Sequence, residues 1–138
     1  MIMDTNEMSE YLVSIGGLRH AWGSHEIIIN NPKFFGVGSG WYPIIKDLID
    51  GLIKLGWDKN VIQVKQKFGG LRFYIDEGSD EMHKLIIEAE RKSYETCEKC
   101  SEKGKARRDI GWHLTLCDEH YQEKIKEINV QKSKTQDN

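Results

Sequence analysis

The sequence lacks the long apolar segments of membrane proteins. No apolar run in its 138 residues approaches the roughly 20 that a membrane-spanning helix needs. The N-terminal segment carries Asp4, Glu7 and Glu10 and has no basic stretch leading into an apolar one, which is unlike a secretory signal. We therefore expect a cytoplasmic protein that makes no membrane contact.

An excess of either charge is also missing. The chain has 20 Lys and Arg residues against 22 Asp and Glu residues, for a formal net charge of −2. A protein dedicated to duplex DNA normally carries a strong positive excess, because it neutralises many phosphates. Cysteine is scarce as well: three cysteines cannot all pair, which excludes a full disulfide framework and indicates metal-binding or free thiols.

What the sequence does contain is a clear succession of amphipathic segments. Residues 4–15 predict a helix that ends at Gly16-Gly17, and residues 42–55 predict one that begins near Pro43 and ends at Gly56. Residues 80–95 predict a third helix, for which Ser79 is a plausible N-cap. Residues 25–29 are a candidate strand.

The strongest local signal is a β-hairpin. Residues 61–68 and 71–76 alternate in polarity on either side of Gly69-Gly70, a pair suited to a two-residue turn. This turn would pair Lys67 with Arg72 and Lys65 with Tyr74. One face is then core, carrying Ile62, Val64, Phe68, Leu71, Phe73 and Ile75.

All three cysteines fall into one metal-binding pattern. Cys97 and Cys100 form a C-x2-C pair, and after sixteen further residues Cys117 and His120 form a C-x2-H pair. Zinc prefers thiolate and imidazole ligands, and two closely spaced pairs can surround the ion tetrahedrally. Three thiolates and one imidazole leave no position for water, so the sequence predicts a structural zinc ion.

The surroundings of these ligands predict the rest of a treble-clef-like module. Residues 104–109 and 112–116 can form a short hairpin, and a helix follows from Asp118. The predicted fold class is thus α+β, with a helix–β-hairpin–helix core over residues 1–96 and the zinc module over 97–128. The polar residues 129–138 have no apolar periodicity and predict a disordered tail.

The zinc segment also invites comparison with the ββα-metal site of HNH-type nucleases. Such a site needs a general-base histidine and a metal ion with open coordination positions. His120 is already assigned to the zinc shell, and His113 fits a partly exposed strand residue. No nucleophile–base pair stands out elsewhere, so a non-enzymatic protein is favoured and nuclease activity is the least favoured function.

The polar face of the predicted hairpin is the first candidate binding surface. It carries Lys65, Lys67, Arg72 and Tyr74. Two like charges facing each other cost up to ~1 kcal/mol, which a bound phosphate would offset, and a base could stack on the tyrosine ring. The alternative is a solvated face on which the Lys and Arg stems lie over the ring.

The glycine-rich residues 35–41 are a second candidate wall for a ligand. Gly36, Gly38 and Gly40 would let the backbone approach a ligand closely, although the context of a dinucleotide-binding motif is missing. The four tryptophans are expected in the core or at the domain junction: Trp22, Trp41, Trp57 and Trp112.

Three segments of the chain form a recognisable set. They are residues 40–45 (GWYPII), residues 63–74 (QVKQKFGGLRFY), and the zinc ligands together with Gly111-Trp112 and residues 115–120 (TLCDEH). Together they resemble an uncharacterised family of small zinc-binding proteins of bacteria and phages. The chain departs from that pattern at Ser101, where glycine is usual, and at His113, where an aliphatic residue is usual. The resemblance covers about residues 40–120 and implies a shared fold and surface, not a reaction.

Three functions remain open at this point. The leading hypothesis is a binding protein that holds a nucleotide-sized, phosphate-bearing ligand on the hairpin face; in a phage, it would sequester a host signalling nucleotide as counter-defence. The main alternative is a nucleic-acid-binding zinc module that uses the basic residues Lys99, Lys103, Lys105, Arg107 and Arg108. The third is an adaptor whose basic patches meet an acidic surface of a host protein.

Overall fold

The computed structural model describes residues 2–21 and 28–136. Within these residues the protein is a mixed α+β structure of four α-helices and two small sheets, which confirms the predicted class. No helix in the described part is both long and apolar enough to cross a membrane. In chain order the elements are α1 (Thr5–Ser14), β1 (Leu18–His20), β2 (Ile28–Ile29), η1 (Pro32–Phe34), η2 (Ser39–Trp41), α2 (Tyr42–Lys54), β3 (Asn60–Lys67), β4 (Gly70–Ile75), α3 (Asp80–Ser93), β5 (Lys105–Arg107), β6 (Leu114–Leu116) and α4 (Asp118–Gln136).

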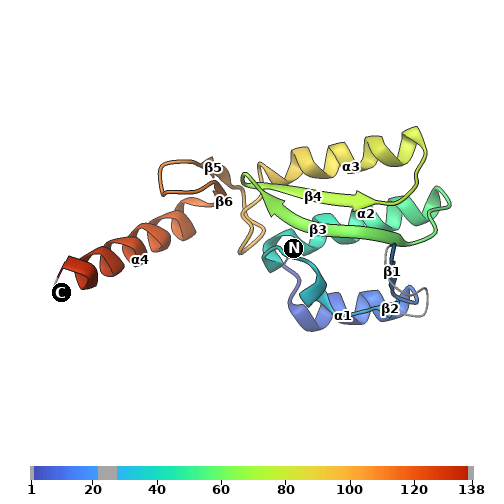
Figure 1. Ribbon diagram of the computed structural model, residues 1–138, viewed down its shortest axis with the longest axis horizontal. Coiled ribbons are helices and arrows are strands. Elements are labelled where there is room, and N and C mark those ends of the chain that lie inside the picture. Colours follow the sequence, from blue (N-terminus) through green and yellow to red (C-terminus); the bar gives the residue numbers. More distant parts are fainter. Residues whose placement is uncertain (1, 22–27, 137–138) are drawn as a thin grey trace.

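The main sheet has the strand order β2-β1-β3-β4. Strand β1 runs parallel to β3, and the other two pairs are antiparallel. Helix α1 packs against α2, both helices share one hydrophobic core with the sheet, and α3 packs against α2 and runs along β4 (Figure 1). The core is built around Trp41, Ile45, Ile49 and Leu52, all fully buried.

The three helices predicted for the first two thirds of the chain are confirmed, with ends that their cap residues explain. Asp4 and Glu7 form a reciprocal capping box at the start of α1. Pro43 lies in the first turn of α2, where a missing N–H costs nothing. The Ser79 hydroxyl accepts a hydrogen bond from the Met82 N–H at the start of α3.

The hairpin is present, but its turn lies one residue earlier than predicted. Phe68 and Gly69, with φ of 55° and 84°, are the two turn residues, and Lys67 pairs with Gly70. Positive φ at both positions matches a type I′ turn. The change moves the partner of Lys65 by two positions, from Tyr74 to Arg72. Because the shift is even, the side chains from Gln63 to Lys67 and from Leu71 to Ile75 keep their predicted faces.

Two of the predicted core residues of the hairpin are not in the core. Phe68 is 63% exposed because the turn carries it beyond the sheet. Ile62 is only half-buried, since a β-bulge lies between Val61 and Gln63 and Val61 takes its place in the core. Val64, Leu71, Phe73 and Ile75 are buried as predicted.

The N-terminal part adds a strand that local patterns do not reveal. Leu18–His20 is too short to show alternation, and its parallel partner β3 lies some forty residues away in sequence. Of the strand predicted over residues 25–29, Ile28–Ile29 forms β2, and residues 25–27 lie outside the described residues, as does Trp22.

The C-terminal part forms the predicted short hairpin and helix. Strands β5 and β6 are antiparallel, and α4 points away from the rest of the molecule (Figure 1). The helix continues to Gln136, into the segment for which the sequence predicts disorder. Val130–Gln136 contains no glycine or proline, so helix propensity persists where apolar periodicity has ended.

Candidate metal centre and aromatic groove

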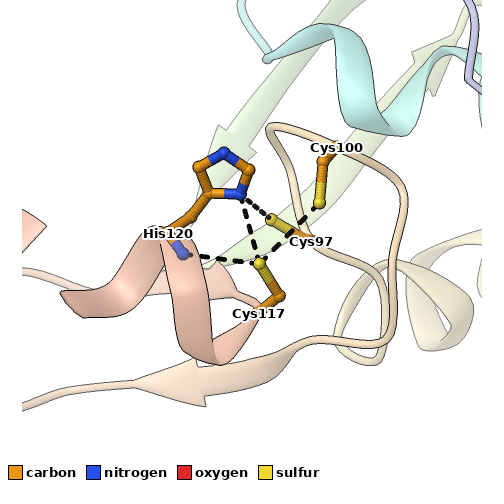
Figure 2. A group of neighbouring side chains, drawn as sticks. All are labelled: Cys97, Cys100, Cys117 and His120. Carbon is orange, nitrogen blue, oxygen red and sulfur yellow. Dashed lines mark hydrogen bonds between the residues drawn. The ribbon is translucent and has the colours of Figure 1, made fainter. Parts of the chain in front are cut away.

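The four predicted metal ligands converge on one point (Figure 2). Cys97 and Cys100 come from the loop after α3, Cys117 follows β6, and His120 lies in the first turn of α4. Their sulfur and nitrogen atoms all lie within 4.8 Å of one another. The prediction that these side chains form one cluster that could hold a metal ion is confirmed.

The spacing of the ligand atoms fits a tetrahedral ion. The sulfur atoms of Cys100 and Cys117 are 3.7 Å apart, and His120 Nδ1 lies 3.2 Å from the sulfur of Cys117 and 3.6 Å from that of Cys97. Zinc–sulfur bonds of about 2.3 Å at tetrahedral angles place two sulfurs roughly 3.8 Å apart. The donor set and its dimensions therefore suit a closed metal shell.

The protein environment already favours negative charge at Cys97. Burial would raise the pKa of this thiol, but backbone hydrogen bonds with Cys117, Lys99 and Cys100 outweigh it and hold the pKa below its usual value. Burial, together with the neighbouring thiols, instead raises the pKa of Cys100. A bound cation would favour the thiolate form of both.

The glycine-rich loop before α2 is packed against the first ligand pair. A Cβ on Gly40 would lie 2.2 Å from the carbonyl oxygen of Cys97, and one on Gly38 would lie 2.4 Å from that of Glu98. The Gly40 N–H donates to the Glu98 carbonyl, and the Ser101 hydroxyl donates to the Gly40 carbonyl. Close backbone approach is thus the role of Gly38 and Gly40, but it serves the metal loop. The hypothesis of a ligand wall there is not supported at these two glycines.

Further contacts join the metal module to the sheet. The indole N–H of Trp41 donates to the Thr96 carbonyl, and the Thr115 hydroxyl donates to the carbonyl of Gly69 in the hairpin turn. The Gln66 side-chain amide donates to the carbonyl of His113. The three sequence segments of the family resemblance therefore meet at one junction.

The predicted ligand-binding face is divided in the structure. Lys67 and Tyr74 are exposed and Lys65 is half-buried. Arg72 turns toward α3, where it forms a 2.6 Å ion pair with Glu90 and donates to the Tyr94 hydroxyl. Burial opposes the charge of Arg72, but these two partners raise its pKa above the usual value. Its charge is therefore largely neutralised within the protein.

The basic cluster between the cysteines is only partly available. Arg107 is held by Asp118 at 2.7 Å and lies over the ring of Tyr121. The others are exposed, and no ion pair between described residues involves them: Lys99, Lys103, Lys105 and Arg108. They lie on and beside the β5 hairpin.

A groove of about 520 Å³ lies where the turn of the β3–β4 hairpin meets the metal module. Its lining residues come from both parts: Gln66, Phe68, Glu98, Trp112, His113 and Leu114. Phe68 is 63% exposed and Trp112 is 47% exposed. The sequence did not predict this groove, because Phe68 was expected in the core and Trp112 in the core or at the junction. No local signal could have placed Phe68 at the tip of the turn, because a type I′ turn prefers asparagine, aspartate or glycine at that position.

Each of the two exposed rings has a lysine beside it. The Lys67 ammonium lies 5.6 Å from the ring centre of Phe68, and that of Lys124 lies 5.0 Å from the ring centre of Trp112. Burial raises the pKa of Glu98, although the N–H of Gly38 and the charge of Lys99 oppose the shift. The surface thus combines exposed aromatic rings, cations and one carboxyl group, and we call it the aromatic groove.

A second hollow, of about 390 Å³, lies beside Lys65. His20 and Phe34 meet edge to face on its border, with ring centres 5.8 Å apart, and Gln63 also lines it. Of the predicted ligand-binding residues, Lys65 belongs to this hollow and Lys67 lies beside the aromatic groove. The four share one face of the hairpin, on which Lys65 is directly opposite Arg72, but neither of the two hollows is lined by all of them.

The comparisons with known proteins give no relative. No family model matches the chain, and no curated protein and no solved structure is similar to it. The family resemblance stated above stays a prediction, as do the division into two domains and the phage association.

Proposed function

We propose that the protein is a non-enzymatic, zinc-stabilised protein that binds single-stranded nucleic acid along the aromatic groove. The observation that carries the proposal is the exposed position of Phe68 in a left-handed backbone conformation. Left-handed φ costs an ordinary residue about 1–2 kcal/mol, and asparagine or glycine is preferred at this turn position. Phe68 gains little compensating burial: its ring meets that of His113 edge to face, with ring centres 5.7 Å apart, but most of the side chain stays exposed. A contact outside the chain would account for the rest of this cost.

Exposed aromatic rings with cations beside them are the features by which proteins bind single-stranded nucleic acids. Bases stack on aromatic side chains irrespective of sequence, with about 1–3 kcal/mol per base, and lysines neutralise the phosphates between them. Phe68 and Trp112 supply the rings, and Lys67 supplies a cation next to the first. Lys124 lies next to the second and is ion-paired with Glu127 at 3.4 Å. The metal module carries further exposed lysines, Lys99, Lys103 and Lys105. A binding surface that included them would suit an extended single strand better than an isolated nucleotide.

We further propose that the metal ion is zinc and that its role is structural. Three thiolates and an imidazole are the donors that zinc prefers, and the four would fill its tetrahedral shell. Zinc would hold the loop of Cys97 and the start of α4 together, and so position Trp112 and Glu98 against the hairpin turn. It would take no part in a reaction, because no coordination position is left for a substrate.

The experiment is a titration of labelled oligothymidylate by fluorescence anisotropy, with a duplex of equal length as comparison. We expect the single strand to bind more tightly, with affinity falling as salt rises. Trp112→Ala should weaken binding about tenfold, and Lys67→Ala should reduce the salt slope by about 0.7. Lys84→Ala, an exposed lysine of α3 that does not line the groove, is the matched control and should leave both unchanged. Absence of salt-sensitive single-strand binding would contradict the proposal.

A nucleotide-sized ligand is the second candidate, and the hollow beside Lys65 favours it. Its volume lies in the range of small-ligand sites, and it combines an aromatic pair with a lysine and an amide. A thermal-shift panel of mono-, di- and cyclic nucleotides tests it. Stabilisation that Lys65→Ala abolishes and Lys67→Ala retains would favour this function over the first.

A further inference from the structure

Two residues that line the aromatic groove each have a side-chain oxygen that receives no hydrogen bond from any described residue. Glu98 accepts the Gly38 N–H at 2.8 Å with Oε2, and Gln66 donates to the carbonyl of His113 at 2.8 Å with Nε2. Only the nitrogen of the Gln66 amide can donate to a carbonyl, so this bond fixes the direction of its oxygen. Among the described residues, no hydrogen bond reaches Glu98 Oε1 or Gln66 Oε1.

Neither oxygen is fully buried. In the described part of the chain, the one fully buried side-chain polar atom without a partner is Trp57 Nε1. Glu98 Oε1 and Gln66 Oε1 therefore each have some solvent-exposed area. Both residues line the aromatic groove together with Phe68 and Trp112. A planar ring stacked on Phe68 or Trp112 in this groove would have Gln66 and Glu98 among its neighbours.

The nucleic-acid bases differ in how well their edges satisfy two acceptors. Guanine presents two adjacent donors, N1–H and the 2-amino group. Adenine and cytosine present one amino group next to an acceptor nitrogen, and thymine and uracil present one N–H between two carbonyls. An acceptor that faces another acceptor loses its water without a replacement, which costs about 1–3 kcal/mol.

We infer that the aromatic groove selects guanine, with Glu98 and Gln66 as the specificity-determining residues. The inference rests on the proposed single-strand binding, to which it adds a base preference. Stacking on Phe68 and Trp112 holds any base, whereas the two oxygens distinguish guanine from the others.

The test uses oligothymidylate with one central base replaced in turn by guanine, adenine, cytosine or inosine, titrated against the zinc-loaded full chain. We expect the guanine oligonucleotide to bind about tenfold more tightly than oligothymidylate. Inosine keeps N1–H and lacks the 2-amino group, so its affinity should lie between the two. Glu98→Gln keeps an oxygen for the Gly38 N–H and places a donor in the groove. This variant should lose the guanine preference.

The outcomes separate the inference from the proposed function. Equal affinity for all central bases overturns the guanine preference and leaves single-strand binding standing. A guanine preference that survives intact in Glu98→Gln overturns the role of Glu98. Failure of every oligonucleotide to bind overturns both.

Discussion

Single glycines determine how closely the metal loop approaches the sheet. At Gly40 a methyl group would lie 2.2 Å from the Cys97 carbonyl oxygen, which is backbone and cannot rotate away. At Gly36 the same group would find its nearest neighbour at 3.6 Å, an ordinary contact. Gly36 therefore has room for a Cβ atom, whereas Gly40 does not.

Gly40→Ala is therefore expected to lower the free energy of unfolding by about 2 kcal/mol or more, since the loop must shift to relieve the overlap. It should also weaken metal binding, because Cys97 moves with the loop. Denaturant unfolding and competition with a metal chelator measure the two effects. Gly36→Ala is the control and should change neither; equal effects of the two substitutions would contradict the packing described for this loop.

The hairpin shows what local sequence can and cannot predict about an element. Alternation assigned most side chains of β3 and β4 to the correct face, because the side-chain period does not depend on the turn. The turn itself was wrong by one residue, since Gly69-Gly70 is the usual choice and Phe68 at positive φ runs against local preference. Gly70 is required for another reason: a Cβ there would overlap the ring of Tyr94.

The metal ligands were predictable and the groove was not, for related physical reasons. Cys97, Cys100, Cys117 and His120 come in two short-range pairs, so their spacing is visible along the chain. The groove depends on long-range contacts, such as Thr115 with Gly69, that no pattern of spacing records. The same limit applies to Arg72. The sequence predicted it as a phosphate ligand, because its ion pair with Glu90 on α3 is not visible in the spacing of residues along the chain.

The metal site links the two parts of the molecule. Helix α4 points away from the sheet, and its first turn carries His120 (Figure 1, Figure 2). The loop of Cys97 is bound in turn to the loop before α2 and to β6, through Gly40 and Thr115. Loss of the metal ion would therefore lower the stability of the core as well as that of the metal module.

Purified protein is accordingly expected to contain one zinc ion per chain by elemental analysis. A strong chelator should lower the thermal midpoint of the whole protein, since binding of a structural zinc ion contributes roughly 10 kcal/mol to folding in peptides. Cys117→Ser should reproduce the effect without a chelator. Protein that carries no stoichiometric metal and has the same midpoint with and without chelator would contradict a structural zinc site.

The most direct measurement compares stability and oligonucleotide binding in Phe68→Asn. Asparagine before Gly69 is the preferred type I′ pair, so the free energy of unfolding should rise by about 1 kcal/mol as the strain at Phe68 is removed. Affinity for oligothymidylate should fall about tenfold with the loss of one stacking ring. Higher stability together with weaker binding is the result expected if the exposed ring of Phe68 contacts a ligand. A variant that is less stable and binds as tightly as the wild type would show that Phe68 serves the fold, and would contradict the proposed function.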